Sequence, residues 1–159
     1  MKEILLTQGK VTLVDDEDYK RLNTYKWYAV HDNRNWYAIR SFRVNGEQKT
    51  ILMHREIMNA PKGMQVDHHN GNGLYNLKKN LRLATNQQNQ FNRKHPQKNN
   101  KLGIKGVQWH KRIKKFTAQI RINGNKIHLG YFNVLGDADS AYRIAEDKYF
   151  GEFARTTTK

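Results

Sequence analysis

The chain has 159 residues, enough for one domain or two small ones, and its 29 Lys and Arg against 14 Asp and Glu give a formal net charge of +15. It contains no cysteine, which excludes disulfides and a four-cysteine zinc site, and no apolar run approaches the roughly 18 residues of a membrane span. Since residues 1–3 also lack the start of a signal peptide, we expect a cytoplasmic protein with no structural zinc and no membrane contact.

The positive charge is concentrated in the second half of the chain. Residues 68–136 contain no Asp or Glu, although Lys and Arg recur throughout this stretch. A long segment of one sign indicates a polyanionic partner, most simply a nucleic acid. The plainer alternative is a generic basic protein such as a ribosomal one.

Residues 1–60 are predicted to form a small β-rich scaffold. Gln8-Gly9 and Asn45-Gly46 are hairpin turn signals between runs of β-branched and aromatic residues. Asp15 is placed to cap a short helix through Leu22.

A DNA-facing surface on this scaffold is the functional alternative. It would be formed by the basic residues Arg34, Arg40, Arg43 and Lys49. His54, just before a short helical run, is expected to be structural or to contact a phosphate.

Residues 61–92 are predicted to fold as strand, loop, strand and helix. Met64–Val66 and Leu81–Leu83 are the expected strands, with the flexible sequence Asn70–Gly73 between them. Thr85 is placed to cap a helix from residue 86 to about residue 91.

Four polar residues in this segment carry the chemistry. Asp67-His68 is followed by Asn80 twelve residues after the histidine and by Asn89 nine residues later. Carboxylate and carboxamide oxygens suit Mg²⁺ or Mn²⁺, and a neutral imidazole can take a proton from water near pH 7. Such a set can hold one divalent cation and one general base on a phosphodiester.

This segment resembles the HNH nuclease family, closest to its homing-endonuclease branch, whose active site is a ββα-metal motif. The resemblance implies that His68 is the general base, that Asp67 and Asn89 ligate the metal, and that Asn80 fixes the orientation of the imidazole. His69 would point to the opposite face of the strand and is expected to pack or to contact a phosphate.

Beyond a basic linker at residues 93–101, residues 102–159 predict a three-stranded antiparallel sheet covered by one helix. Phe116–Ile122 alternates apolar and polar residues, and Asn123-Gly124 signals a hairpin turn. The next strand is expected to place Ile127, Leu129 and Tyr131 on the apolar face. The helix, from about residue 135 to 150, is expected to turn five residues inward: Ala138, Ala141, Tyr142, Ala145 and Tyr149.

This second unit resembles the ethylene-response-factor (APETALA-type) DNA-binding domain. The resemblance rests on Gly106-Val107, Ala118–Arg121, Leu129–Phe132 and Tyr149–Gly151. A ribbon of this width fits the DNA major groove. The residues expected to contact DNA are Lys105, Gln108, His110, Arg112, Arg121, Lys126 and His128.

The sequence therefore predicts an α+β protein with an HNH domain at 1–92 and a DNA-binding domain at 102–159. We expect a metal-dependent endonuclease that cuts double-stranded DNA, leaves 5′-phosphate and 3′-hydroxyl ends, and uses Mg²⁺ or Mn²⁺ but no small-molecule cofactor. The C-terminal sheet would give site preference by tethering, and a monomer with one active site would nick one strand. This layout is typical of phage and mobile-element enzymes, which implies a bacterial or phage-infected host cell.

Two other functions fit parts of the sequence. One is a non-enzymatic DNA-binding regulator with a decayed HNH motif, and the other is an RNA-binding protein. A groove-reading sheet favours duplex DNA, because the major groove of RNA is too narrow for it.

Overall fold

The computed structural model describes residues 1–32, 35–91 and 100–154 and shows a mixed α+β fold, as predicted. The chain divides into two compact units, Met1–Asn89 and Gln90–Lys159, and the boundary falls inside helix α3 (Asn86–Phe91). Most of the predicted basic linker lies at residues 92–99, outside the described residues, as does Arg34.

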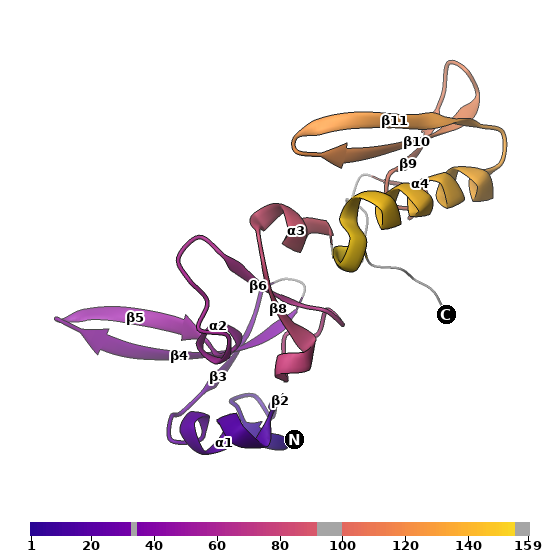
Figure 1. Ribbon diagram of the computed structural model, residues 1–159. Helices are drawn as coiled ribbons and strands as arrows, with labels where there is room; N and C mark the ends of the chain where they lie inside the picture. Colours follow the sequence, from indigo (N-terminus) through magenta and orange to yellow (C-terminus); the bar gives the residue numbers. More distant parts are fainter. Residues whose placement is uncertain (33–34, 92–99, 155–159) are drawn as a thin grey trace. The chain divides into compact units, whose positions relative to one another are not determined.

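The first unit begins with a hairpin of β1 (Lys2–Leu5) and β2 (Val11–Val14), drawn in indigo in Figure 1. The predicted turn at Gln8-Gly9 is confirmed, with positive φ at both residues. Strand β2 also pairs in parallel with β7 (Tyr75–Asn76), which lies more than sixty residues later in the chain. This long-range pair connects the scaffold to the segment that carries the predicted chemistry.

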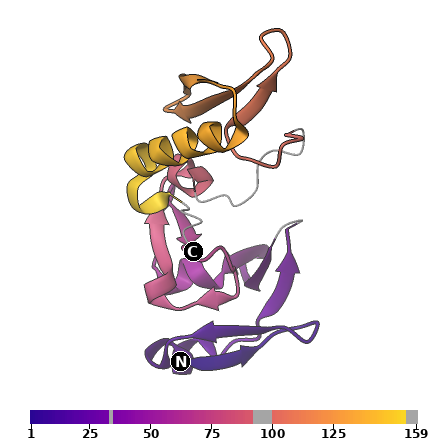
Figure 2. The same cartoon turned by 90° about the vertical axis from the view of Figure 1, so that its right-hand side faces the viewer.

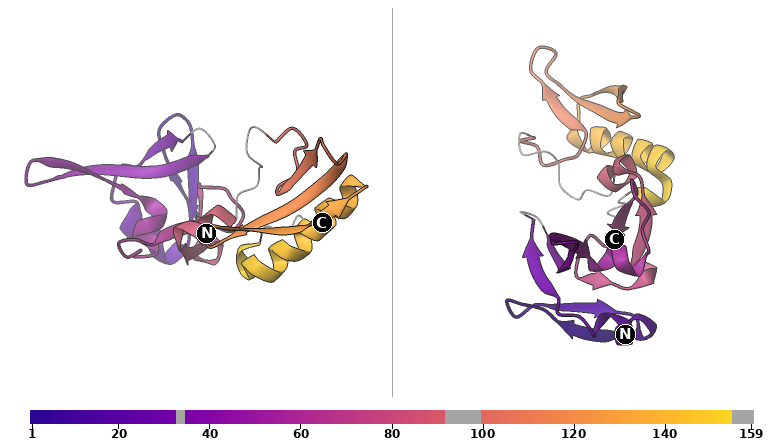
Figure 3. Two further views of the ribbon diagram at one scale, coloured as in Figure 1. Left: turned by 90° about the horizontal axis from the view of Figure 1, so that it is seen from above. Right: turned by 90° about the vertical axis from the view of Figure 1, so that its left-hand side faces the viewer.

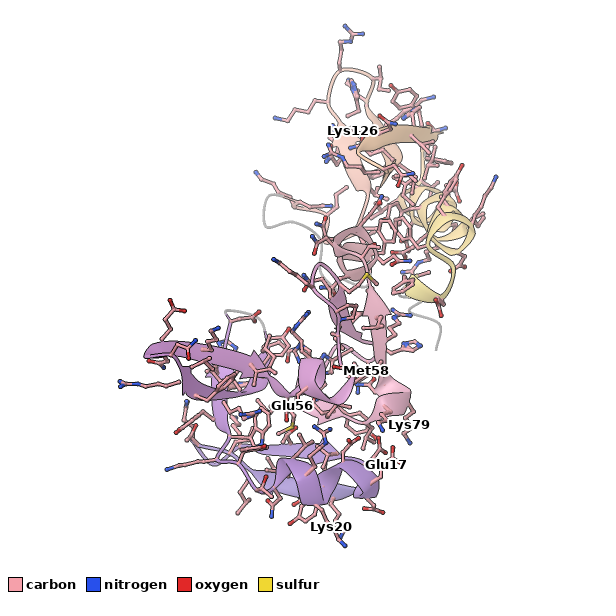
Figure 4. All side chains as sticks on the ribbon, turned by 60° about the vertical axis from the view of Figure 1, so that its left-hand side comes forward. Glu17, Lys20, Glu56, Met58, Lys79 and Lys126 are labelled. Atoms are coloured by element: carbon pink, nitrogen blue, oxygen red, sulfur yellow. The ribbon has the colours of Figure 1, made fainter. Side chains whose placement is uncertain are left out.

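Helix α1 (Asp16–Leu22) follows β2 and ends at Leu22, as expected, and the Leu22 side chain is fully buried. Asp15 occupies the cap position, but its carboxylate accepts a hydrogen bond from the backbone N–H of Lys78 at 2.7 Å instead of capping the helix. The prediction of a side-chain cap was wrong because a partner distant in sequence takes the carboxylate. The labels of Glu17 and Lys20 mark this helix in Figure 4.

A second sheet has the antiparallel order β3 (Tyr28–His31), β4 (Trp36–Val44) and β5 (Glu47–Leu52). The Asn45-Gly46 turn joins β4 to β5 as predicted, and Figures 1 and 3 show this hairpin projecting from the unit. Arg40 on β4 donates to Glu56 at 3.0 Å and its guanidinium lies 4.0 Å from the Tyr25 ring centroid. Arg40 therefore stabilises the scaffold, in contrast to the DNA-facing alternative.

Helix α2 (Met53–Ile57) leads into β6 (Gln65–His68), which pairs antiparallel with β8 (Leu81–Ala84). Between these two strands the chain forms β7 and the short 3-10 helix η1 (Lys78–Asn80). One apolar core joins β1, β2, α1, β3, β4, α2, β6 and β8. Its buried residues are Ile4, Leu6, Val14, Leu22, Trp27, Ala29, Ala38, Met53, Ile57, Val66 and Leu81.

The second unit is the predicted three-stranded antiparallel sheet with one long helix. The strand order is β11 (Asn125–Phe132), β10 (Lys115–Ile122) and β9 (Val107–His110), and α4 (Leu135–Phe150) lies along one face of the sheet, as Figure 2 shows. At Gly106, where φ is +71°, a Cβ would fall 2.0 Å from the Tyr142 ring of α4. Only glycine permits this close approach of helix and sheet.

The expected alternation along β11 was wrong beyond its midpoint. The register between β10 and β11 shifts at Ala118/Gln119, so that Tyr131 pairs with Thr117 and Gly130 pairs with Ala118. A bulge adds one residue and reverses which side chains face the core. Tyr131 is consequently 52% exposed on the polar face.

Helix α4 buries Ala138, Tyr142 and Ala145, as predicted, but Tyr149 is 40% exposed. The neighbouring Phe150 is buried in its place, because its ring stacks on Phe91 at a centroid distance of 3.7 Å. A contact outside the sheet thus sets which residue of the last helical turn faces inward. No helix in the part of the chain that the structure describes is long and apolar enough to cross a membrane.

Candidate active site

The β6–β8 pair followed by α3 gives the predicted order of strand, loop, strand and helix. Thr85 caps α3 as expected: the Gln88 N–H donates to the Thr85 hydroxyl at 3.2 Å, and the Thr85 N–H donates to the Gln88 side chain at 2.8 Å. This reciprocal pair is a capping box, which fixes where the helix begins.

Asp67 lies on β6 and is only 4% exposed. The Arg82 side chain, opposite it on β8, donates to the Asp67 carboxylate from Nε at 2.8 Å and approaches it with a second nitrogen at 2.7 Å. The Asp67 carboxylate is therefore held by Arg82 near the end of a strand, where it offers oxygen atoms as donors.

His68 follows Asp67 and is also buried, at 5% exposed. Its Nε2 lies 3.0 Å from Oδ1 of Asn76 on β7. Burial lowers the pKa of His68, and the hydrogen bond to Asn76 and the charge of Asp67 act in the opposite direction. The imidazole is therefore neutral at pH 7, the form that can accept a proton. His69, in contrast, is exposed.

Asn80 differs from the expectation. Its carboxamide accepts from the Asn70 backbone N–H at 3.0 Å and donates to Asn70 Oδ1 at 3.1 Å and to the Tyr75 carbonyl at 2.8 Å. The Asn80 side chain thus organises the loop between β6 and β7, whereas the imidazole bonds to Asn76. Sequence reasoning missed Asn76 because its contact depends on the β2–β7 pairing.

Asn89 lies one turn into α3, where its N–H donates to the Thr85 carbonyl at 3.0 Å. Within residues 1–32, 35–91 and 100–154, no group of three or more His, Cys, Asp and Glu side chains could hold a metal. The predicted ligands, Asp67 and Asn89, are one carboxylate and one carboxamide. Their oxygens are the donor type that Mg²⁺ and Mn²⁺ prefer, and those ions commonly keep water and substrate phosphate as further ligands.

Comparison with known proteins decides the family. The HNH endonuclease model matches residues 59–91, the segment that contains β6, β8 and α3. Protein 3.8 of Escherichia phage T7 is 34% identical over 95 residues, which cover 60% of this chain and 77% of that protein. The chain belongs to the HNH endonuclease family.

A second relative extends over nearly the whole endonuclease. The uncharacterized HNH endonuclease L560 of Acanthamoeba polyphaga mimivirus is 29% identical over 154 residues, which cover 94% of this chain and 77% of that protein. No solved structure matches the endonuclease.

The scaffold of the endonuclease supplies two aromatic side chains beside His68. The His54 ring on α2 and the Tyr37 ring on β4 have centroids 5.0 and 6.1 Å from that of His68. Burial is the main reason that the pKa of His54 falls to about 3, with the neighbouring His68 and Arg55 adding to the effect. His54 is therefore an uncharged side chain that packs against His68. No hydrogen bond of its Nδ1 is found among the described residues.

The loop before β7 is also fixed by the scaffold. Asn35 donates from Nδ2 to the Gly71 carbonyl at 2.7 Å and accepts from the Gly73 N–H at 3.3 Å. At Gly73 a Cβ would lie 2.6 Å from the Tyr37 ring, so the loop packs directly on that ring. The region predicted to be a β-rich scaffold therefore builds part of the candidate active site.

In the second unit, the polar face of the sheet carries most of the residues expected to contact DNA. Arg121 on β10 and Lys126 on β11 pair with each other across the strands, and both are exposed. Figure 4 labels Lys126 on this unit. The exposed or half-buried members are Gln108, His110, Arg112, Arg121, Lys126 and His128.

Two residues of this unit depart from the expectation. Lys105 donates to Glu146 of α4 at 2.6 Å and to the Phe91 carbonyl at 2.7 Å, so its ammonium group is held by the protein. Tyr131, which sequence reasoning assigned to the core, lies 4.5 Å from His128 and 5.9 Å from His110 between ring centroids. Tyr131 thus joins the polar face.

Proposed function

We propose that this HNH endonuclease hydrolyses phosphodiester bonds in double-stranded DNA, with His68 as the general base and Asp67 and Asn89 as metal ligands. The observation that carries the proposal is the buried Asp67-His68 pair at the end of β6, held by Arg82 and Asn76. Both side chains are fixed before DNA binds. Such preorganisation lowers the cost of reaching the transition state.

His68, Asn80 and the metal ion have different roles in this proposal. His68 accepts a proton from the attacking water, and Asn80 holds the loop that follows the histidine. A bound Mg²⁺ or Mn²⁺ would stabilise the charge that develops on the phosphate and on the leaving 3′ oxygen. Attack by water on the phosphorus with loss of the 3′ oxygen gives 5′-phosphate and 3′-hydroxyl ends.

The second unit supplies binding and site preference in this proposal. Its polar sheet face exposes cationic and imidazole side chains, while the apolar face is covered by α4. This division supports an ethylene-response-factor-like mode in which the sheet enters the major groove. Tethering to such a reader raises the local concentration of the cutting unit at a preferred site.

Digestion of supercoiled plasmid with Mg²⁺, with Mn²⁺ and with EDTA tests the proposal. We expect cutting with either ion, none with EDTA, and 5′-phosphate ends that a ligase can seal. Open-circle product that appears before linear product would indicate that the enzyme nicks one strand. Cutting that persists in EDTA would contradict the metal-dependent mechanism.

A further inference from the structure

A chain of hydrogen bonds runs from the scaffold to the imidazole of His68. The Thr12 hydroxyl on β2 donates to the Leu74 carbonyl at 2.9 Å and accepts from Nδ2 of Asn76 at 2.8 Å. Oδ1 of the same Asn76 lies 3.0 Å from Nε2 of His68. Thr12 is fully buried and Asn76 is 1% exposed, so bulk water does not compete for these groups.

Each bond in this chain has one possible direction. A backbone carbonyl can only accept, so the single hydroxyl proton of Thr12 is committed to Leu74. The Thr12 oxygen must then accept from Asn76, which places the Asn76 amide nitrogen toward Thr12 and its oxygen toward His68. A carboxamide oxygen cannot donate, so the proton of this bond belongs to Nε2 of His68.

The sulfur of Met53 is the other acceptor near this chain. It lies 3.9 Å from the Thr12 oxygen and 3.7 Å from Asn76 Nδ2. A thioether is a weak acceptor, and the Leu74 carbonyl is much closer to the Thr12 hydroxyl. Met53 therefore does not reverse the direction of the chain.

We infer that Thr12 and Asn76 are positioning residues that keep a proton on Nε2 of His68, so that Nδ1 is the atom that takes the proton from water. The inference rests on the proposed role of His68 as the general base. The rings of His54 and Tyr37 support it, because they pack against the imidazole and restrict its rotation.

The proton balance of the step follows directly. One water proton moves to Nδ1, the water oxygen forms a bond to phosphorus, and the bond from phosphorus to the 3′ oxygen breaks. The leaving oxygen takes a proton from solvent. The imidazolium formed at His68 keeps its Nε2 proton and donates it in a hydrogen bond to the Asn76 oxygen, which stabilises the new positive charge.

The tautomer can be measured in the full-length wild-type protein. Nitrogen NMR of histidine-labelled endonuclease at pH 7.5, with His68→Gln to assign the signal, reports which ring nitrogen carries the proton. We expect a single form protonated on Nε2. A signal for the form protonated on Nδ1, or an equal mixture of the two, would overturn the inference whether or not any variant folds.

A matched pair of variants tests the function of the chain. Thr12→Val keeps the shape but removes the hydroxyl, whereas Thr12→Ser keeps the hydroxyl. Loss of an outer partner of a functional histidine typically costs about 10-fold to 100-fold in activity. We expect a loss of that size in the single-turnover cleavage rate of Thr12→Val at saturating protein, near wild-type cleavage by Thr12→Ser, and unchanged plasmid affinity in EDTA for both.

The outcomes separate the inference from the proposed function. Equal cleavage by Thr12→Val and wild type, with His68→Ala inactive, would overturn the positioning role alone. Wild-type cleavage by His68→Ala would overturn the proposed function itself. A mixed His68 tautomer in folded Thr12→Val, together with slow cleavage, would support both.

Discussion

The two units of this endonuclease use polar residues in opposite ways. In the first unit Asp67, His68 and Asn80 are buried, and each is hydrogen-bonded to protein groups. In the second unit Arg121 and Lys126 stand exposed on a sheet face whose other side packs on α4. Chemistry needs side chains in one orientation, whereas a DNA-reading face needs side chains that can reach the partner.

This contrast implies that substitutions in the first unit should change rate and stability, and those on the exposed face should change affinity.

His68→Ala should lower the single-turnover cleavage rate by at least about 100-fold, since a general base typically contributes 100-fold to 10,000-fold. Plasmid affinity in EDTA should stay within about twofold of wild type, because the side chain is buried. Quench-flow or gel-based time courses with a parallel binding titration provide the measurement. A variant that loses binding and cleavage together would show that His68 is structural.

Asp67→Asn should abolish metal-dependent cleavage and also destabilise the fold. It removes the negative charge that faces Arg82, and losing one partner of a buried pair costs on the order of 3 kcal/mol. Urea unfolding gives the free energy. Asp16→Asn, in an exposed pair with the N-terminal amine, is the control and should change stability far less.

Stability should depend on pH through His54. Burial holds its folded pKa at about 3, below the ordinary 6.5, so the unfolded chain binds the proton first as pH falls. The contribution of His54 is therefore complete above pH 6.5 and is lost toward pH 3, by about 1.4 kcal/mol for each pH unit. In urea unfolding at several pH values, His54→Phe should show a smaller slope, and an identical slope would contradict this account.

Arg121→Ala should weaken duplex binding by about 1–3 kcal/mol if its guanidinium contacts a base, while the melting temperature stays close to wild type. Lys105→Ala should instead lower the melting temperature and leave duplex affinity close to wild type, because Lys105 bonds to Glu146 and to the Phe91 carbonyl within the unit. Gel-shift titrations at fixed salt and thermal unfolding separate the two effects. Equal loss of affinity in both variants would show that Lys105 contacts DNA, as the sequence predicted.

Local signals in the sequence predicted local structure well. The turns at Gln8-Gly9 and Asn45-Gly46 formed where predicted, with positive φ at both residues of each, and Thr85 caps α3 through a partner three residues away. The alternation of β10 likewise placed Ala118 and Ile120 in the core. In each case the interaction that decides the structure lies within a few residues.

Contacts between distant segments could not be predicted in this way. Asn76 reaches His68 because β2 pairs with β7, and neither strand indicates the other in the sequence. The bulge in β11 that exposes Tyr131 has no local signal strong enough to override the alternation. The candidate chemical groups were thus identifiable from their spacing, but the partners that orient them were not.

A crossed comparison of His68→Ala and Arg121→Ala separates catalysis by the first unit from DNA binding by the second. Cleavage rate at saturating protein and plasmid affinity in EDTA are measured for both variants beside wild type. We expect that His68→Ala binds normally but does not cut, and that Arg121→Ala binds weakly but cuts at the wild-type rate once saturated. Normal cutting by His68→Ala, or a slow rate for saturated Arg121→Ala, would contradict the division between a buried catalytic unit and an exposed reading unit.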